Sequence, residues 1–473
     1  MLLKRFYYER LAHASYMIGC QVTKEAIVVD AHRDTDLYVR AAEAEGLRIR
    51  FVTETHIHAD YLSGSRQLAR QTGAELILSG EGDETWQYAF GEHEGARIVR
   101  DGDEIRLGNV VIGVLHTPGH TPEHLSFSVT DGASASVPMG MLTGDFIFVG
   151  DVGRPDLLEK AAGFADTMEA GARVLYASLQ RIRSMPGYTQ ILPGHGAGSA
   201  CGKALGAVPS STLGYELLVN WAFQCGTEEE FIRKVLEDQP EPPVYFAEMK
   251  RMNRDGPAIL DGMPSPKLLS PERVFATMEG DGVVLDVRPR EHFAAGHLPG
   301  SLSAPLGDDF TATCGWHLSY DRPLSLLAEG SAQAEEAARA LAYIGLDDVV
   351  GYFDVDAFPA WERDRGGLQA TDIIAWPEAE RAAAEEGAFL LDVRGRTEWA
   401  EGHAPGAGHI HYGVLRRRAD ELPRDRPIVV YCQAGGRSAI AAALLQAEGF
   451  EDVRNVRDGM NARKSLGLPV ETG

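Results

Sequence analysis

The first half of the chain alternates short apolar runs with polar turns, and several runs end in His or Asp. The clearest runs are EAIVVDAHRD (25–34), RIRFVTETH (48–56), AELILSG (74–80), VVIGVLHTPGH (110–120), MLTGDFIFVGD (141–151) and TQILPGHG (189–196). Such runs predict strands, and helical patterns such as DLYVRAAEAEG (36–46) lie between them. Strands that finish in polar, ligand-type residues indicate a site built on loops at one edge of a sheet. We therefore expect an α/β fold with a mixed sheet here.

The second half contains a duplicated unit. VVLDVRPREHFAAGHLPGS (283–301) returns 106 residues later as FLLDVRGRTEWAEGHAPGA (389–407). Each copy continues into a strand and an Ala-rich helix, which predicts two small α/β domains with parallel sheets. The stretch 237–274 is rich in proline and reads as the end of the first domain and a linker. The predicted organisation is a first domain over 1–245, a linker over 246–267, and two repeat domains over 268–368 and 369–473.

Composition restricts the class of partner and the compartment. The 473 residues carry a formal net charge of −24, which argues against a nucleic-acid partner, because phosphate binding needs a basic surface. No apolar run is long enough for a membrane helix, and the first residues do not read as a signal peptide. The five cysteines show no CxxC spacing. We therefore expect a cytoplasmic protein without membrane contact, and a homo-oligomer.

Four segments offer metal ligands at the ends of predicted strands: THIHADY (55–61), TPGHTPEH (117–124), TGD (143–145) and PGHG (193–196). His56 and His58 are two residues apart, so on an extended segment their side chains point the same way. His120 lies in a Pro-Gly turn that can present its imidazole to the same place. Asp145 adds a carboxylate. Imidazoles combined with a carboxylate suit a first-row divalent ion.

In this order the four segments resemble the metallo-β-lactamase superfamily, over roughly the first 240 residues. The resemblance implies an αββα sandwich. Within the superfamily, the thioester hydrolases of the glyoxalase II type carry a His at the position of Tyr61, and that His helps to hold a second zinc. A neutral phenol is a poor ligand, so the second site has lost a donor here. Asp60 and His195 are then its remnants.

A stronger pointer to one class within the superfamily is GDVGRPDL (150–157), which resembles a segment of the persulfide dioxygenases. These enzymes are similar to glyoxalase II but hold one iron. The resemblance implies one Fe(II) per chain, with Zn as the alternative, held by His56, His120 and Asp145 as a 2-His-1-carboxylate triad. Iron fits because oxygen activation needs redox chemistry that zinc lacks. His58, Asp60 and His195 would orient these ligands through hydrogen bonds.

Three further residues are candidates for substrate binding. The resemblance implies that Arg154 and Asp156 shape the site and bind the anionic end of a thiol substrate; the alternative for Arg154 is an ion pair with Asp156 or Asp151. Cys201 stands between small residues shortly after the PGHG segment and could reach the substrate pocket. Lys203 is expected to lower the pKa of its thiol, and the alternative is a small buried residue in a tight loop.

Both repeats resemble rhodanese (sulfurtransferase) domains. In the second copy, VVYCQAGGRS (429–438), Cys432 follows a strand and Arg437 closes a Gly-rich loop that runs into a helix. Successive backbone N–H groups at a helix N-terminus form an anion nest, which together with Arg437 stabilises a thiolate. We therefore expect Cys432 to be a low-pKa nucleophile that carries sulfane sulfur as a persulfide. The remaining residues of the anion loop are Gln433, Ala434, Gly435, Gly436 and Ser438.

The first copy has Ala328 at the place of Cys432 and Gln333 at the place of Arg437, so we expect it to be inactive. Other residues occur in both copies and are better explained as scaffold, namely Asp286 and Asp392, Arg288 and Arg394, and His297 and His403.

The predicted function joins two chemistries: a persulfide dioxygenase that oxidises a thiol persulfide with O2 to sulfite, and a sulfurtransferase that uses Cys432 to give thiosulfate. The small-molecule partners are the persulfide, O2, sulfite and thiosulfate, and the net role is sulfide detoxification. The first alternative is a dinuclear zinc thioester hydrolase of the glyoxalase II type fused to a sulfurtransferase. The second is a non-enzymatic sulfur relay through Cys201 and Cys432, which leaves the metal ligands unexplained.

Overall fold

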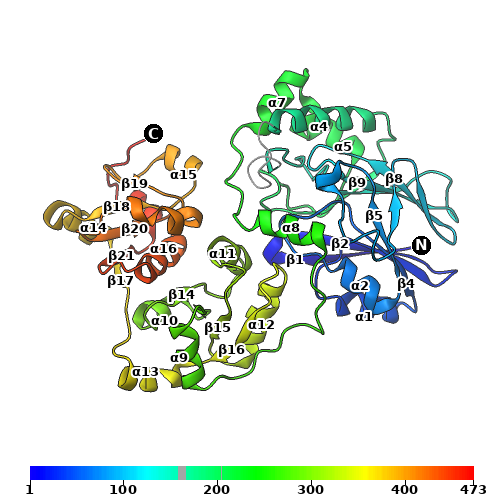
Figure 1. Cartoon of the computed structure of the whole chain (residues 1–473). Coiled ribbons are helices and arrows are strands. Elements are labelled where there is room, and N and C mark those ends of the chain that lie inside the picture. Colours follow the sequence, from blue (N-terminus) through cyan, green and yellow to red (C-terminus); the bar gives the residue numbers. More distant parts are fainter. Residues whose placement is uncertain (158–166, 204, 473) are drawn as a thin grey trace. The chain divides into compact units, whose positions relative to one another are not determined.

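The computed structural model describes residues 1–157, 167–203 and 205–472 of the chain (Figure 1). The chain divides into two compact units, and each is described by itself. The first unit comprises Met1–Met263 with the short segment Tyr343–Gly345, and the second comprises Pro264–Ala342 and Leu346–Gly473. No helix among the described residues is long and apolar enough to cross a membrane.

The first unit contains two six-stranded sheets that share one core. The strands of the first sheet follow the order of the sequence: β1 (Leu2–Tyr8), β2 (His13–Cys20), β3 (Glu25–Val29), β4 (Arg48–Thr53), β5 (Glu75–Ser79) and β6 (Arg97–Val99). The second sheet has the order β12 (Ser211–Thr212), β11 (Gln190–Pro193), β10 (Gly140–Gly144), β9 (Leu125–Asp131), β8 (Val110–His116) and β7 (Glu104–Leu107). Apolar side chains from both sheets, such as Ile27, Phe51, Ile112 and Phe127, pack in one buried cluster.

Helices cover the outer face of each sheet, as the clusters of buried side chains show. α1 (Asp36–Ala44) and α2 (Ser65–Thr72) pack against the first sheet. α4 (Met168–Ile182), α5 (Leu213–Val219), α6 (Trp221–Gln224) and α7 (Glu228–Leu236) pack against the second. The layers are therefore α, β, β and α, which confirms the predicted sandwich. Both sheets are mixed. In the first, β1 to β3 run antiparallel and β3 to β6 parallel. In the second, β10 and β11 run parallel and the other neighbours antiparallel.

The stretch predicted as a linker, 246–267, differs from the prediction in its first half. It begins with a helix, α8 (Phe246–Asp255), and the first unit ends at Met263 rather than at 245. Phe246 and Met249 are buried. The Asn253 amide group donates hydrogen bonds of 2.8 Å to the carbonyls of both His58 and Tyr61. This helix therefore holds the loop that follows β4. The sequence pattern does not predict this helix, because the helix has few apolar residues and prolines lie on both sides of it.

The second unit contains two parallel sheets, one for each repeat. The first has the order β14 (Leu302–Ser303), β13 (Val283–Asp286), β15 (Leu324–Leu327) and β16 (Val349–Phe353). The second has the order β17 (Asp372–Ile374), β21 (Val453–Val456), β20 (Ile428–Tyr431), β18 (Phe389–Asp392) and β19 (Gly408–His409). The accompanying helices are α9 (Pro271–Glu279), α10 (Arg290–Ala295), α11 (Phe310–His317), α12 (Ser331–Ala342) and α13 (Phe358–Asp364), then α14 (Trp376–Arg381), α15 (Arg396–Glu401), α16 (Gly436–Ala447) and α17 (Gly459–Ser465).

The residues shared by the two repeats make the same contacts in both copies. Arg288 pairs with Asp286 at 2.6 Å, and Arg394 pairs with Asp392 at 2.7 Å, all four side chains being buried. His297 and His403 are placed alike: each ring stacks on an aromatic residue of the preceding helix and bonds to that helix's backbone. These contacts brace the fold, in agreement with the scaffold interpretation.

Candidate metal centre and sulfurtransferase site

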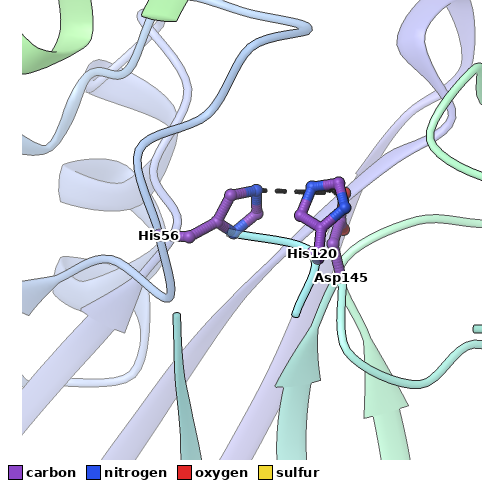
Figure 2. A group of neighbouring side chains, drawn as sticks. All are labelled: His56, His120 and Asp145. Atoms are coloured by element: carbon purple, nitrogen blue, oxygen red, sulfur yellow. Dashed lines mark ion pairs between the residues drawn. The ribbon is translucent and has the colours of Figure 1, made fainter. Parts of the chain in front are cut away.

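Three side chains predicted to bind a metal converge at one edge of the sandwich. His56 follows β4, His120 lies in the loop after β8, and Asp145 directly follows β10. The nitrogen or oxygen atom that each offers lies within 4.8 Å of the other two, and all three residues are buried. Asp145 Oδ2 lies 3.9 Å from His56 Nε2 and 3.5 Å from His120 Nε2. Figure 2 shows Asp145 beside the His120 ring, with His56 facing them.

The backbone around these residues fixes their orientation. Thr55 Oγ1 lies 3.0 Å from the Nδ1 atom of His56, and the carbonyl of Arg154 lies 3.2 Å from the Nδ1 atom of His120. Each ring is thus held at Nδ1, which leaves Nε2 to face Asp145. Gly144 has a φ of +48°, and a Cβ there would lie 2.6 Å from Thr55 Oγ1. The close approach of the Gly144 backbone to Thr55 therefore requires glycine.

The protonation states suit a cation. Burial lowers the pKa of both His56 and His120, so each neutral imidazole keeps a lone pair. Burial opposes the charge on Asp145, but His195 lowers the pKa of its carboxyl, so Asp145 stays anionic. Among the described residues, Asp145 Oδ2 has no hydrogen-bond partner. A buried carboxylate oxygen without a partner beside two neutral imidazoles is a donor set that fits a first-row divalent ion.

His195 does not stand free as a further ligand. Its Nδ1 atom lies 2.7 Å from Asp145 Oδ1, and its Nε2 atom lies 2.8 Å from Asp60 Oδ2. Burial disfavours its charged form, but the two carboxylates raise the pKa of the imidazole well above its ordinary value. Both ring nitrogens then donate, so His195 bridges the two aspartates and orients Asp145. This geometry supports the predicted orienting role of His195 and Asp60.

Tyr61 and His58 lie close to the three candidate ligands, and each has a hydrogen-bond partner in the protein. Tyr61 is fully buried, and its hydroxyl donates to the carbonyl of Asp30 at 3.3 Å. Burial and nearby carboxylates raise the pKa of this phenol well above 10, so it remains neutral. His58 Nε2 lies 3.1 Å from Asp30 Oδ1, so this imidazole is already held by a carboxylate. His58 Nδ1 and Asp60 Oδ1 have no hydrogen-bond partner among the described residues. Both ring nitrogens of His195 are occupied by carboxylates, so a second ion that used this imidazole would have to displace it.

Asp30 and His13 are residues of this site that the sequence interpretation missed. Besides His58, Asp30 accepts hydrogen bonds from the backbone N–H and the hydroxyl of Thr55. The His13 ring lies 4.1 Å from the Tyr61 ring, centroid to centroid. The available signal for Asp30 was its position: it ends the apolar run EAIVVD, just as Asp145 ends a later one. For His13 the sequence offers no such signal.

Arg154 and Asp156, predicted to bind substrate, make a closed set of contacts with the protein. The guanidinium binds both carboxylate oxygens of Asp156, at 2.8 and 2.7 Å, and donates to the carbonyls of Ala200 and Pro240. Both side chains are fully buried. The Arg154 side chain therefore connects its own loop to two distant segments. The backbone carbonyl of the same residue contacts the His120 ring. Substrate binding by this pair stays a prediction.

Cys201 lies near the metal centre, but its expected activation is contradicted. Its sulfur lies within 4.8 Å of the donor atoms of Asp60 and His195. Burial, then the charges of Asp145 and Asp60, raises the pKa of the thiol well above 9. Lys203, expected to lower that pKa, instead donates to the carbonyls of Lys234 and Glu237. A substrate-binding role for Cys201 stays a prediction. Because its pKa is raised, Cys201 would act in that role as a neutral thiol.

The second site is the loop after β20 in the C-terminal repeat. Cys432 Sγ accepts hydrogen bonds from the backbone N–H of Gly435 at 3.1 Å and from the hydroxyl of Ser438 at 3.4 Å. Gly435 has a φ of +87°, a conformation that favours glycine and turns its N–H toward the sulfur. α16 begins directly afterwards, at Gly436. One backbone donor and one hydroxyl of the loop at the N-terminus of α16 therefore face the sulfur.

Arg437 is not free in this loop, because Glu398 of α15 holds it. The two guanidinium nitrogens donate to the two carboxylate oxygens at 2.6 and 2.7 Å, and both side chains are about one third exposed. In the first repeat, Gln333 closes the corresponding loop on itself, because its side-chain oxygen accepts a 2.7 Å bond from the N–H of Glu329. Ala328 follows β15 as Cys432 follows β20.

Comparison with known proteins identifies both parts of the chain. The model of the metallo-beta-lactamase superfamily matches residues 8–195, and that of the rhodanese-like domain matches residues 270–363 and 376–465. A crystal structure of a metallo-beta-lactamase from Staphylococcus aureus subsp. aureus COL is 42% identical, with a TM-score of 0.67, over 75% of this chain and 98% of that one.

Curated relatives match one part or the other. The mitochondrial persulfide dioxygenase ETHE1 of Mus musculus is 27% identical over 41% of this chain and 68% of that protein. A hydroxyacylglutathione hydrolase of Rhodospirillum rubrum is also 27% identical, over 38% of this chain and 60% of that protein. A sulfurtransferase of Allochromatium vinosum is 37% identical over 20% of this chain and 86% of that protein. The chain therefore belongs to the metallo-beta-lactamase superfamily, as a member that carries two C-terminal rhodanese-like domains.

Proposed function

We propose that the first unit oxidises a low-molecular-weight thiol persulfide to sulfite and that Cys432 transfers sulfane sulfur to give thiosulfate. One observation carries the proposal. The donors of His56, His120 and Asp145 face one another without competing partners among the described residues. In contrast, both ring nitrogens of His195 are held by carboxylates, and the Tyr61 phenol beside them is neutral. This arrangement favours a centre for one metal ion over the two-ion centre of a thioester hydrolase.

An Fe(II) ion held by these three residues would supply the redox chemistry for a reaction with O2, which Zn(II) lacks. The chain's own contribution is to hold the ligands and to exclude bulk water. Thr55 and the carbonyl of Arg154 fix the two imidazoles, and His195 fixes the carboxylate. In the balanced reaction, one RSSH, one O2 and one water give one RSH, one sulfite and two protons.

The second unit would move sulfur between carriers. The Cys432 thiolate attacks the outer sulfur of RSSH, forming a Cys432 S–S bond and breaking the RS–S bond, and RSH leaves with the proton. Sulfite then attacks the outer sulfur on Cys432, which regenerates the thiolate and releases thiosulfate. The N–H of Gly435 and the hydroxyl of Ser438 stabilise the thiolate at both stages. Together the two reactions would detoxify sulfide.

Product identity tests the coupling of the two units. Cys432→Ser keeps the shape of the loop but removes the sulfur carrier, so O2 uptake with RSSH should stay near normal while the product changes from thiosulfate to sulfite. Cys225→Ser is the matched control, because that thiol lies in the first unit and outside the metal cluster. Chromatography of the products during aerobic turnover measures the amounts of sulfite and thiosulfate. Continued formation of thiosulfate by Cys432→Ser would show that sulfur is joined to sulfite elsewhere in the chain.

One observation favours a second candidate, a zinc thioester hydrolase with an attached sulfurtransferase. The potential ligand atoms of Asp60, His195 and Cys201 also lie within 4.8 Å of one another, and the Rhodospirillum rubrum relative is a hydrolase by name. Two zinc ions per chain and cleavage of a glutathione thioester would support this candidate.

A further inference from the structure

A cavity of about 270 Å³ lies in the second unit, beside the Cys432 loop. Both rhodanese-like folds form its walls. The inactive fold contributes α10 and the end of β14. The active fold contributes its catalytic loop, β17, and β21 with the two residues that follow it. Its polar lining includes Arg290, Glu291 and Ser303 from the inactive fold, and Gly435, Asn455, Arg457 and Asp458 from the active fold.

Two buried polar groups in the cavity wall have unpartnered atoms. Ser303 is 5% exposed and Asn455 is 4% exposed. Neither the Ser303 hydroxyl nor the Asn455 side-chain oxygen has a hydrogen-bond partner among the described residues. Buried polar atoms in native proteins are nearly always hydrogen-bonded, to protein, water or a ligand, so these two atoms are available to a molecule that enters the cavity. The amide oxygen of Asn455 accepts, so its partner must carry an N–H or O–H group.

Charges of both signs line the same cavity. Arg290 and Arg457 supply two guanidinium groups, and Glu291 and Asp458 supply two carboxylates. Arg290 Nε donates to Glu291 Oε1 at 2.9 Å, which leaves the Nη atoms of Arg290 to face a ligand. Arg290 reaches across to the active fold, where its Nη1 atom would lie 3.5 Å from a Cβ placed on Gly436. The guanidinium of Arg457 makes no hydrogen bond or ion pair within the described part of the chain. A ligand that carries both a carboxylate and an ammonium group matches this surface.

Gly435 connects the cavity to the reacting sulfur. Gly435 lines the cavity, and its backbone N–H donates a hydrogen bond to Cys432 Sγ at 3.1 Å. Arg437, the arginine of the loop itself, is held by Glu398. The positive charges where the loop borders the cavity are therefore those of Arg290 and Arg457. Arg290 belongs to the inactive fold, which has no cysteine nucleophile.

We propose that this cavity recognises the carrier end of an amino-acid-type thiol, one with carboxylate, ammonium and amide groups, whose sulfur is exchanged at Cys432. This inference rests on the proposed sulfurtransferase function and names its substrate class. The carboxylate lies against Arg290 and Arg457, the ammonium group against Glu291 or Asp458, and an amide N–H donates to Asn455. The inactive fold thereby contributes half of the carrier site of its active neighbour.

The test compares two carriers on the full-length protein: the persulfide of glutathione, which has all three groups, and that of 2-mercaptoethanol, which has none. Arg290→Gln should raise the KM for glutathione persulfide in sulfur transfer to sulfite by about tenfold, the equivalent of one lost charge-assisted contact. Its kcat and its KM for the neutral carrier should stay unchanged. Ser303→Ala should raise only the KM for glutathione persulfide as well, by a smaller factor. Arg426→Gln is the control, because Arg426 is exposed and pairs with its neighbour Asp425.

Unchanged KM values in both cavity variants would overturn the carrier site and leave the proposed sulfurtransferase intact. Equal rises for both carriers would overturn it too, because Arg290 would then act on the loop and not on the carrier. A wild-type protein that transfers sulfur from neither carrier would refute the proposed sulfurtransferase, and the carrier site with it. S-methylglutathione gives an independent check: it should compete with glutathione persulfide and inhibit Arg290→Gln about tenfold more weakly.

Discussion

Replacing Arg154 by methionine tests whether this buried arginine is structural. The change preserves an apolar stem but removes four hydrogen bonds, two of them to the Asp156 carboxylate. Leaving a buried charge without its partner typically costs about 3–5 kcal/mol. Two carbonyls also lose a donor. We therefore expect the first unit to lose about 4 kcal/mol of stability. The double variant Arg154→Met/Asp156→Leu removes the stranded charge and should recover most of that loss.

Hydrogen exchange read by mass spectrometry suits this measurement, because peptides from residues 110–157 report on the first unit alone. A loss of about 4 kcal/mol corresponds to exchange faster by roughly a thousandfold in segments that open with the unit. Arg173→Met is the matched control, since Arg173 is 47% exposed and its ion pairs are at the surface; its exchange should match that of the wild type. Two results would refute the reasoning: a single variant that exchanges like the control, or a double variant no better than the single. If exchange is normal and only the KM for persulfide rises, Arg154 binds substrate.

Four further predictions follow from individual side chains. His195→Ala should lower metal affinity by about 10- to 100-fold, because it releases the ligating carboxylate, and metal content after dialysis measures this. Tyr61→His should still bind one metal ion per chain by mass spectrometry, since both ring nitrogens of His195 remain held by carboxylates; a second bound ion would contradict this account. Burial lowers the pKa of His317 to about 3. The unfolded chain therefore binds a proton below pH 6.5 that the native fold does not, and the second unit should lose about 1.4 kcal/mol per pH unit there. His317→Phe should flatten this slope in urea unfolding between pH 5 and 7.5, and an unchanged slope would exclude His317 as its source. Ala328→Cys should give no measurable thiosulfate:cyanide transfer in a Cys432→Ser background, because Gln333 still closes that loop.

The sequence predicted the convergence of the three candidate ligands, because each one follows a strand or lies in a turn after it. The sheet then brings these ends together, so that His56, His120 and Asp145 meet although up to 89 positions separate them. Asp30 obeys the same rule, but it belongs to none of the four segments that resemble a metal-binding motif. The duplication was equally informative: the contacts of Asp286 and Asp392 are the same in both copies.

Other features depend on tertiary contacts that spacing does not encode. The sequence pattern predicts a linker where the structure has α8. This helix is stabilised by packing and by Asn253, whose hydrogen bonds reach residues about 190 positions away in the sequence. Proximity in sequence suggested that Lys203 would activate Cys201, but the lysine points to other carbonyls, and the carboxylates that control the thiol come from distant strands. The partner of Arg437 is likewise a residue 39 positions earlier, on another helix.

The most direct test of the proposed persulfide dioxygenase is metal content measured together with O2 uptake. The protein, purified anaerobically and loaded with Fe(II), should hold one iron per chain and consume one O2 for each glutathione persulfide oxidised. His56→Ala, His120→Ala and Asp145→Ala should each lose both the iron and the uptake. Two zinc ions per chain, with hydrolysis of a glutathione thioester and no O2 uptake with any persulfide, would contradict the account.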